Sequence, residues 1–267
     1  MEYEPSIESD EYEQLFEDSL CDDDNDDTDL DFLLEGRPLA RKRLERAIKR
    51  HLLQKETDIP NKATEQSQLV PGLVLCRNIL SPTLSNLYFD WLEAEYFPHT
   101  SENPSAGDQN RVNQGMHFGT LSDASTPLGY LAHICSKVTG LLPEQLQSRV
   151  YDQGIINLYD PGEGIGDHID LLRFEDGICG FSFGGTASMR MILATDVERA
   201  ARYAKEVDDE QGECVWARVR AGDLYAFAGD ARYRWTHGFP KQIDGKDNVS
   251  GRRISVTLRK LCGGSVV

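Results

Sequence analysis

The second half of the chain, from Val150 onward, has the pattern of short strands separated by turns. Apolar residues come in brief runs, several of them alternating with polar residues, and glycine-rich turns stand between the runs. The runs are QGIINLY, ICGFSFG, ASMRMILA, CVWARVR, DLYAFAG, RYRWTHG and RRISVTLRKL. Seven or eight strands in this arrangement are typical of a β-sandwich or barrel. The polar insert 196–212 is the one long interruption, and its composition favours a mobile segment.

The preceding stretch combines a strand pattern with a helical pattern. LVPGLVLCRNIL, which starts at Leu69, predicts an edge strand with a bend at Pro71-Gly72. Ser81 has the properties of an N-cap for a helix whose first residue is Pro82. The apolar side chains of that helix fall on one face: Leu84, Leu87, Tyr88, Trp91 and Leu92.

The segment before Val150 contains a loop and a second helix. Residues 98–110 are rich in Pro, Gly, Ser and Asn, which predicts a loop, and RVNQGMHFG (111–119) leads out of it. A helix is expected around 127–140, with Gly140 as its breaker. We therefore expect one domain over 69–267 that is mainly β with flanking helices.

The N-terminal residues carry two charge runs of opposite sign. Residues 1–36 hold sixteen acidic and no basic residues, whereas residues 37–56 hold eight basic and two acidic ones. The first run has too few apolar side chains to offset the entropy of ordering, which predicts a disordered acidic arm. The second run has an imperfect apolar stripe, which predicts a basic helix that a polar linker extends to residue 68. The net charge of −17 thus comes mostly from the arm.

Both charge runs have more than one interpretation. The acidic arm is either a solubilising tail or an interaction arm, which would dock a protein partner or compete with nucleic acid for a basic surface. The basic helix either follows a phosphate backbone or pairs with the acidic arm next to it.

The cysteine spacing and the hydropathy of the chain argue against a zinc module, a disulfide-bonded secreted protein and a membrane-anchored protein. The six cysteines stand singly, without the paired spacing of a zinc module or a disulfide framework, which favours a reducing compartment. The chain has no secretory pattern at its start and no apolar run of membrane-spanning length. We expect a monomer in the cytoplasm, the nucleus or both, without a membrane anchor.

The candidate chemistry centres on NLYDPGEGIGDHID (157–170). His168 and Asp170 are two residues apart, so in an extended segment both side chains point to the same face and reach one metal ion. Two such ligands and a distant histidine form the facial triad of non-heme Fe(II) oxygenases. The candidate for that histidine is His237, because Tyr233, Trp235 and His237 share one face of a predicted strand. The alternative is a core histidine whose ring is only hydrogen-bonded.

The last predicted strand, RRISVTLRK, has one polar and one aliphatic face. Its polar face carries Arg253, Ser255, Thr257 and Arg259. If that face lies in the interior, each buried arginine needs a carboxylate partner. The alternative is an edge strand with its arginines in water.

Taken together, these motifs resemble the AlkB family of Fe(II)- and 2-oxoglutarate-dependent dioxygenases over about residues 69–262. The motifs are Asn157-x-Tyr159 with PGEGI, His168-x-Asp170, RYRWTHG and Arg253-x-Ser255-x-Thr257-x-Arg259. FEDGICGFSFG and DARYRWTHG look most like the eukaryotic branch near the tRNA wobble-uridine hydroxylase. The resemblance implies a double-stranded β-helix, or jelly roll, with flanking helices.

The resemblance also implies a role for each motif residue. His168, Asp170 and His237 would hold Fe(II). Arg253 would clamp the distal carboxylate of 2-oxoglutarate with help from Tyr159, and Arg259 would lie near the keto-acid end and Asp170. Asn157 would orient the co-substrate. Ser255 stands where many members have asparagine, which leaves a shorter polar group there. Oxygen is the second co-substrate, and succinate and carbon dioxide are released.

The resemblance leaves the substrate class open. Family members act on alkylated or modified nucleic-acid bases, in DNA or RNA, or on protein side chains. Residues 98–119 occupy the position of the family's substrate-recognition lid, where Met116, His117 and Phe118 either stack on a flipped base or merely pack on the barrel. A third hypothesis, an inactive binding module, is disfavoured because the metal and acid-binding residues are intact. Oxidation of bases in nucleic acid is the expected function.

Overall fold

The computed structural model describes residues 36–53, 64–67, 69–98, 113–137, 150–194 and 214–263. The acidic arm predicted over 1–36, apart from Gly36, lies outside these residues. The polar insert 196–212 and nearly all of the loop 98–110 also lie outside them, as does the predicted helix breaker Gly140.

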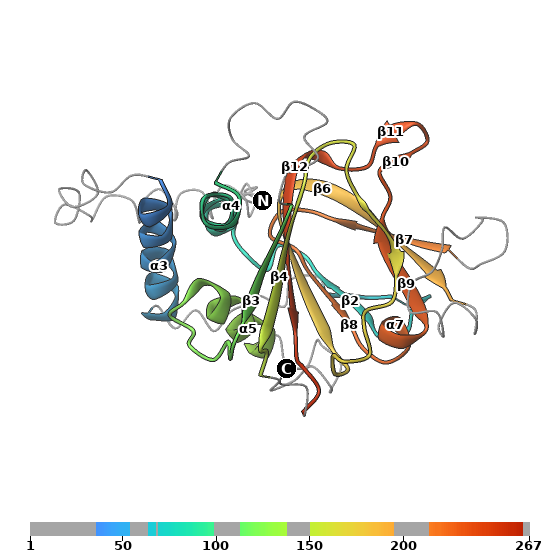
Figure 1. Cartoon of the computed structure of the whole chain (residues 1–267), viewed down its shortest axis with the longest axis horizontal. Helices are drawn as coiled ribbons and strands as arrows, with labels where there is room; N and C mark the ends of the chain where they lie inside the picture. Colours follow the sequence, from blue (N-terminus) through green and yellow to red (C-terminus); the bar gives the residue numbers. More distant parts are fainter. Residues whose placement is uncertain are drawn as a thin grey trace, which may run out of the picture.

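Helices alternate with short strands in the first half of the described chain, and strands dominate from residue 153 onward (Figure 1). The helices are α3 (Arg37–Leu53), α4 (Pro82–Tyr96), α5 (Pro127–Lys137) and α7 (Asp230–Tyr233). The first strands are β1 (Thr64–Gln66), β2 (Leu73–Cys76), β3 (Gln114–Phe118), β4 (Gln153–Tyr159), β5 (Ile165–His168) and β6 (Ile178–Leu193). The later strands are β7 (Cys214–Val219), β8 (Leu224–Phe227), β9 (Trp235–Phe239), β10 (Gln242–Ile243), β11 (Lys246–Asp247) and β12 (Ser250–Arg259).

Apart from β10 and β11, which pair with each other in a hairpin, the strands form two antiparallel layers that share β6. One layer has the order β1-β2-β8-β6-β12-β4-β3. In the other layer, β9 pairs with β5 on one side and with the second half of β6 on the other, and β7 pairs with β6 as well. This arrangement is the expected double-stranded β-helix (Figure 1).

The sharing of β6 differs from the sequence-based prediction of two separate strands. Residues 178–184 pair with β8 and β12, and residues 187–193 pair with β7 and β9. The chain changes layer at Gly184, whose φ of 73° is favourable only for glycine. A Cβ atom there would also lie 2.5 Å from the carbonyl oxygen of Arg252. The glycines that looked like a turn are therefore a bend within one long strand.

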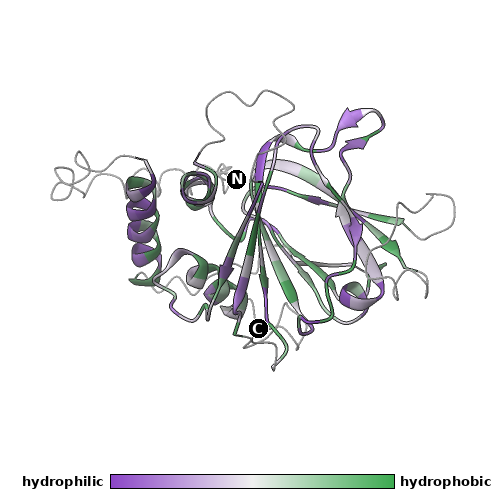
Figure 2. Cartoon of the chain, in the orientation of Figure 1, coloured by the Kyte–Doolittle hydropathy of each residue, from purple (hydrophilic) through white to green (hydrophobic). Residues whose placement is uncertain are grey.

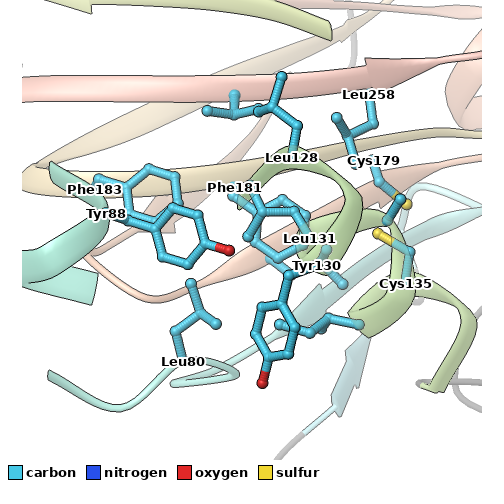
Figure 3. Close-up of a cluster of buried hydrophobic side chains, with 14 of the residues drawn as sticks. Leu80, Tyr88, Leu128, Tyr130, Leu131, Cys135, Cys179, Phe181, Phe183 and Leu258 are labelled. Carbon is cyan, nitrogen blue, oxygen red and sulfur yellow. The ribbon is translucent and has the colours of Figure 1, made fainter. Parts of the chain in front are cut away.

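The first layer buries aliphatic and aromatic side chains against the helices. The β12 residues Ile254, Val256 and Leu258 are fully buried there, which confirms the predicted apolar face of that strand. Tyr88 of α4 stacks on Phe183 of β6, with ring centroids 5.3 Å apart (Figure 3). Because strand residues alternate between faces, the other face of this layer points into the space between the two layers.

Helix α4 begins as its sequence predicts. Pro82 is its first residue, and the Ser81 hydroxyl accepts a hydrogen bond from the backbone N–H of Leu84 at 3.3 Å. Tyr88 and Trp91 are buried on the face toward the sheet. This capped, amphipathic helix covers the first layer on the side away from the space between the layers (Figure 1).

Helix α3 packs against the domain. Leu44 and Ile48 have no exposed surface and belong to the same apolar cluster as α4 and α5. Ala40 and Ala47 pack against the same cluster, and most of the remaining residues of the helix are polar (Figure 2). Strand β1, which lies in the segment predicted as a linker, pairs with β2. We expected the domain to begin near Leu69. In the structure, α3 and β1, which precede Leu69, also contact it. None of the helices in the described ranges has the length and apolar character required to cross a bilayer.

Candidate metal and co-substrate site

Strands β5 and β9 bring two predicted site histidines together. His168 and His237 are direct partners in the antiparallel pairing, and their ring centroids lie 4.5 Å apart. Trp235 and His237 share a face of β9 as predicted, but Tyr233 belongs to the helical turn α7 and not to the strand. Phe227 packs on the His237 ring at 4.6 Å, which fixes the ring at the base of the site.

Asp170 completes the cluster from the segment that follows β5. Its side chain is buried, and its Oδ2 lies 3.7 Å from Nε2 of His237 without a hydrogen-bond partner. Its Oδ1 forms an ion pair with Arg259. Burial opposes ionisation of this carboxyl, but Arg259 and His237 outweigh burial and lower the pKa of Asp170 below its usual value. The carboxylate is therefore negatively charged at neutral pH.

The two imidazoles are arranged to present lone pairs. Nδ1 of His168 lies 2.9 Å from the carbonyl oxygen of Gly166, so that nitrogen donates its proton and leaves Nε2 as an acceptor. Burial, with a further contribution from His168, lowers the pKa of His237 to about 3. The His237 ring is therefore neutral, the form that metal binding requires.

Arg259 currently supplies the positive charge that balances Asp170. Within the described ranges, no three His, Cys, Asp or Glu side chains already have their donor atoms in metal-ligand geometry. One oxygen of the Asp170 carboxylate is engaged by the Arg259 guanidinium, and the other faces His237.

Arg253 is buried on the inner face of β12. Of the two alternatives from the sequence, an interior polar face and an edge strand with its arginines in water, the structure has the first for this residue. It has no exposed surface, and its Nε donates a hydrogen bond to the Ser182 hydroxyl at 2.9 Å. The guanidinium lies 4.3 Å from the Phe239 ring centroid and 5.4 Å from that of Tyr159. Its two terminal nitrogens have no hydrogen-bond partner. A buried cation in this state requires an anionic ligand.

The neighbouring strands supply the remaining predicted co-substrate residues. Tyr159 is paired with Arg253, and Asn157 is paired with Ser255, so all four share the inner face of the first layer. Burial is the main reason that the pKa of Tyr159 is raised to about 12, so its hydroxyl keeps its proton. Gln114 of β3 donates to Oδ1 of Asn157 at 2.8 Å, which orients that amide.

A cavity of about 450 Å³ lies between the two layers. Its lining includes the cluster of His168, Asp170 and His237 together with Asn157, Tyr159, Ser255 and Arg259. One chamber is therefore lined by the Asp170 carboxylate and two imidazoles, and the buried Arg253 packs against Tyr159 in its wall.

A family model described as the 2OG-Fe(II) oxygenase superfamily matches residues 72–259. The chain belongs to this superfamily. It is an AlkB-like 2-oxoglutarate-dependent dioxygenase, as its relatives indicate, and the jelly roll is the fold expected for it. The superfamily uses Fe(II) and 2-oxoglutarate.

Three relatives illustrate the similarity. The tRNA (carboxymethyluridine(34)-5-O)-methyltransferase ALKBH8 of Mus musculus is 29% identical over 66% of this chain and 25% of its own length. The N6-methyladenosine RNA demethylase ALKBH of Cryphonectria parasitica is 32% identical over 40% of this chain and 47% of its own length. The solved structure of OsALKBH1 aligns with a TM-score of 0.47 and 16% identity, covering 73% of this chain and 100% of that one. The chain thus spans about a quarter to a half of the length of these two curated relatives.

The unpaired polar atoms of the oxygenase match the groups that its superfamily requires. Oδ2 of Asp170, the neutral ring of His237 and Nε2 of His168 suit a divalent cation. The unpaired nitrogens of Arg253 suit a carboxylate. Each of these atoms would otherwise be an uncompensated cost of folding.

The predicted substrate residues separate onto two faces of β3. Met116 and Phe118 pair with Ile155 and Gln153, whose side chains lie on the cavity face of β4. Their side chains are 52% and 62% exposed. His117 is paired with Gly154 and lies on the opposite face, toward the helices. The expectation that all three contact one substrate group is therefore corrected, because a strand cannot present consecutive residues to the same side.

Arg232 of the oxygenase was not identified from the sequence. Its side chain is buried and donates to the backbone carbonyls of Asp170 at 3.0 Å, Leu171 at 2.8 Å and Phe174 at 3.3 Å. Burial lowers its pKa. The available signal was its position in RYRWTHG, five residues before His237, but nothing in the sequence shows which carbonyls it reaches.

Proposed function

We propose that the cluster of His168, Asp170 and His237 binds Fe(II) and that Arg253 binds the distal carboxylate of 2-oxoglutarate. The observation that carries this proposal is the buried guanidinium of Arg253, whose two terminal nitrogens lack partners. It packs on Tyr159 and Phe239, and both of these residues line the cavity that also holds the three candidate ligands. Tyr159, Asn157 and Ser255 complete the co-substrate side. When bound, iron and 2-oxoglutarate supply the oxidation of a substrate C–H bond, with release of succinate and carbon dioxide.

The protein side chains prepare this chemistry by placement and charge. The carbonyl of Gly166 fixes the tautomer of His168, so that its Nε2 faces the cluster. Arg259 keeps Asp170 ionised and holds one of its oxygens, leaving Oδ2 for the cation. Phe227 and Phe239 border the site with apolar surface and limit the access of water to it.

The proposed substrate is an alkylated or otherwise modified base in nucleic acid. The names of the ALKBH8 and ALKBH relatives refer to a tRNA uridine and to N6-methyladenosine in RNA, and this supports RNA as the first class to test. Met116 and Phe118 add support, because a thioether and an aromatic ring on the cavity face of an edge strand suit the stacking of a flipped base.

The proposed function is tested by incubating the full chain with Fe(II), 2-oxoglutarate and oxygen in the presence of candidate substrates. The substrates are RNA and DNA oligonucleotides with methylated or modified bases, and methylated peptides. Mass spectrometry should detect loss of a methyl group or gain of an oxygen on a base, and the effect should disappear in Asp170→Ala. Oxidation of the peptides alone would contradict a nucleic-acid substrate while leaving the iron chemistry intact.

A further inference from the structure

Tyr225 of β8 lines the cavity from the same layer as Asn157 and Tyr159, with β6 and β12 between β8 and β4. Its side chain is almost fully buried and lines the same chamber as Tyr159, Ser255 and Thr257. Neither the motifs nor the family resemblance assigns it a role.

The ring of Tyr225 lies flat over Gly180, its partner on β6. A Cβ atom on Gly180 would lie 2.1 Å from Cζ of Tyr225 and 2.5 Å from its hydroxyl oxygen. Gly180 is also paired with Thr257 of β12, so the phenol extends across β6 toward the strand that carries Arg253 and Ser255. The absence of a side chain at position 180 therefore creates the space in which this ring lies.

The hydroxyl of Tyr225 has no protein partner in the described part of the chain. Two other buried tyrosines do have one: the Tyr88 hydroxyl donates to the carbonyl of Pro127 at 2.8 Å, and that of Tyr151 donates to Sγ of Cys179 at 3.1 Å. A buried phenol normally forms such a bond. Tyr225 is close enough to Tyr159 to affect the ionisation of that hydroxyl, so the two phenols flank one space.

We propose that the Tyr225 hydroxyl donates a hydrogen bond to bound 2-oxoglutarate, an inference that rests on the proposed function of the cavity. A dicarboxylate with a keto group offers only acceptors, and the hydroxyl can donate to any of them. The ligand would then be held along one wall of the chamber, by Arg253 of β12 and Tyr159 of β4 and, from the other side of β12, by Tyr225 of β8. Because Gly180 has no side chain, the Tyr225 ring can pack close to the β6 backbone, which leaves room for the ligand in the chamber.

The test is calorimetric titration of 2-oxoglutarate into the full chain loaded with Mn(II), which prevents turnover. Tyr225→Phe should weaken binding by about tenfold to a hundredfold, because it removes one hydrogen bond to a charged ligand. Gly180→Ala should also weaken it, because the added methyl group pushes the ring into the chamber. The affinity for Mn(II) should stay unchanged in both variants, since neither residue belongs to the metal cluster.

A matched control and a reference variant separate the possible outcomes. Tyr151→Phe removes an equally buried hydroxyl on the helix side of the sheet and should leave 2-oxoglutarate binding unchanged. Arg253→Lys should weaken binding because lysine lacks the planar fork. Wild-type affinity in Tyr225→Phe, or an equal loss in Tyr151→Phe, would overturn the role of Tyr225. Wild-type affinity in Arg253→Lys would instead contradict the proposed function.

Discussion

At the scale of single residues, the site depends on buried polar side chains, and each of them has a different set of hydrogen-bond partners. Arg253 and Arg232 are both buried arginines, but they serve different ends. Arg253 leaves its two terminal nitrogens for a ligand, whereas Arg232 uses its two terminal nitrogens on main-chain carbonyls of the segment after β5. Arg232 therefore acts on the candidate ligand Asp170 through the backbone, as a positioning residue.

Replacement of Arg232 tests this positioning role. Arg232→Met should lower the free energy of unfolding by about 2–5 kcal/mol, because three buried carbonyls lose their donor. It should also weaken iron binding about tenfold to a hundredfold, since the segment that carries Asp170 is no longer fixed. Chemical denaturation and iron titration measure the two effects. Arg234→Met is the matched control, because the Arg234 side chain is exposed and forms an ion pair with Asp230, four residues before it. An unchanged iron affinity in Arg232→Met would contradict the positioning role.

At the scale of elements, the basic helix α3 has two sides with different roles. Leu44 and Ile48 are buried against the domain, so the helix is held by packing as well as by its own propensity. Arg37 also reaches Glu95 of α4, with Nε 3.5 Å from a carboxylate oxygen, although an exposed pair of this kind contributes little. The basic outer face remains available to bind nucleic acid. Deletion of the helix would expose the apolar surface of the domain that Leu44 and Ile48 cover.

Truncation of one buried leucine measures that attachment. Leu44→Ala should lower the free energy of unfolding by about 2–5 kcal/mol, the usual cost of a cavity in a core. Leu53→Ala, at the 71% exposed end of the same helix, should change it by less than about 0.5 kcal/mol. Denaturant unfolding of both variants provides the comparison, and equal stabilities would show that α3 does not belong to the folded domain.

Element prediction from the sequence succeeded where alternation or capping was strong. The alternating runs at β4 and β12 and the Ser81-Pro82 start of α4 agree with the structure. It failed where geometry depends on distant contacts, as in β6, where a glycine pair marks a bend and not a turn. The β10–β11 hairpin was missed although Asp244-Gly245, both at positive φ, is a recognised hairpin signal.

At the scale of the whole molecule, the jelly roll converts separate motifs into one chamber. The β5 and β9 pairing brings residues 168 and 237 together, and the pairing of β12 with β4 sets Arg253 beside Tyr159. The sequence predicted these residues through the family resemblance, because the order of the motifs is characteristic. It could not predict that the Tyr225 ring packs on Gly180 or that Arg232 donates to the carbonyl of Asp170. Both contacts depend on which segments become neighbours in space.

The most direct test of this account is the iron content of the chain after anaerobic loading with Fe(II) and removal of free metal. The wild-type chain should retain about one iron per molecule and form succinate from 2-oxoglutarate when oxygen is admitted. Asp170→Ala should lose both properties while remaining folded, and Asp247→Ala, which removes an exposed carboxylate on the β10–β11 hairpin, should keep both. Full iron content and normal succinate formation in Asp170→Ala would contradict the assignment of the metal cluster.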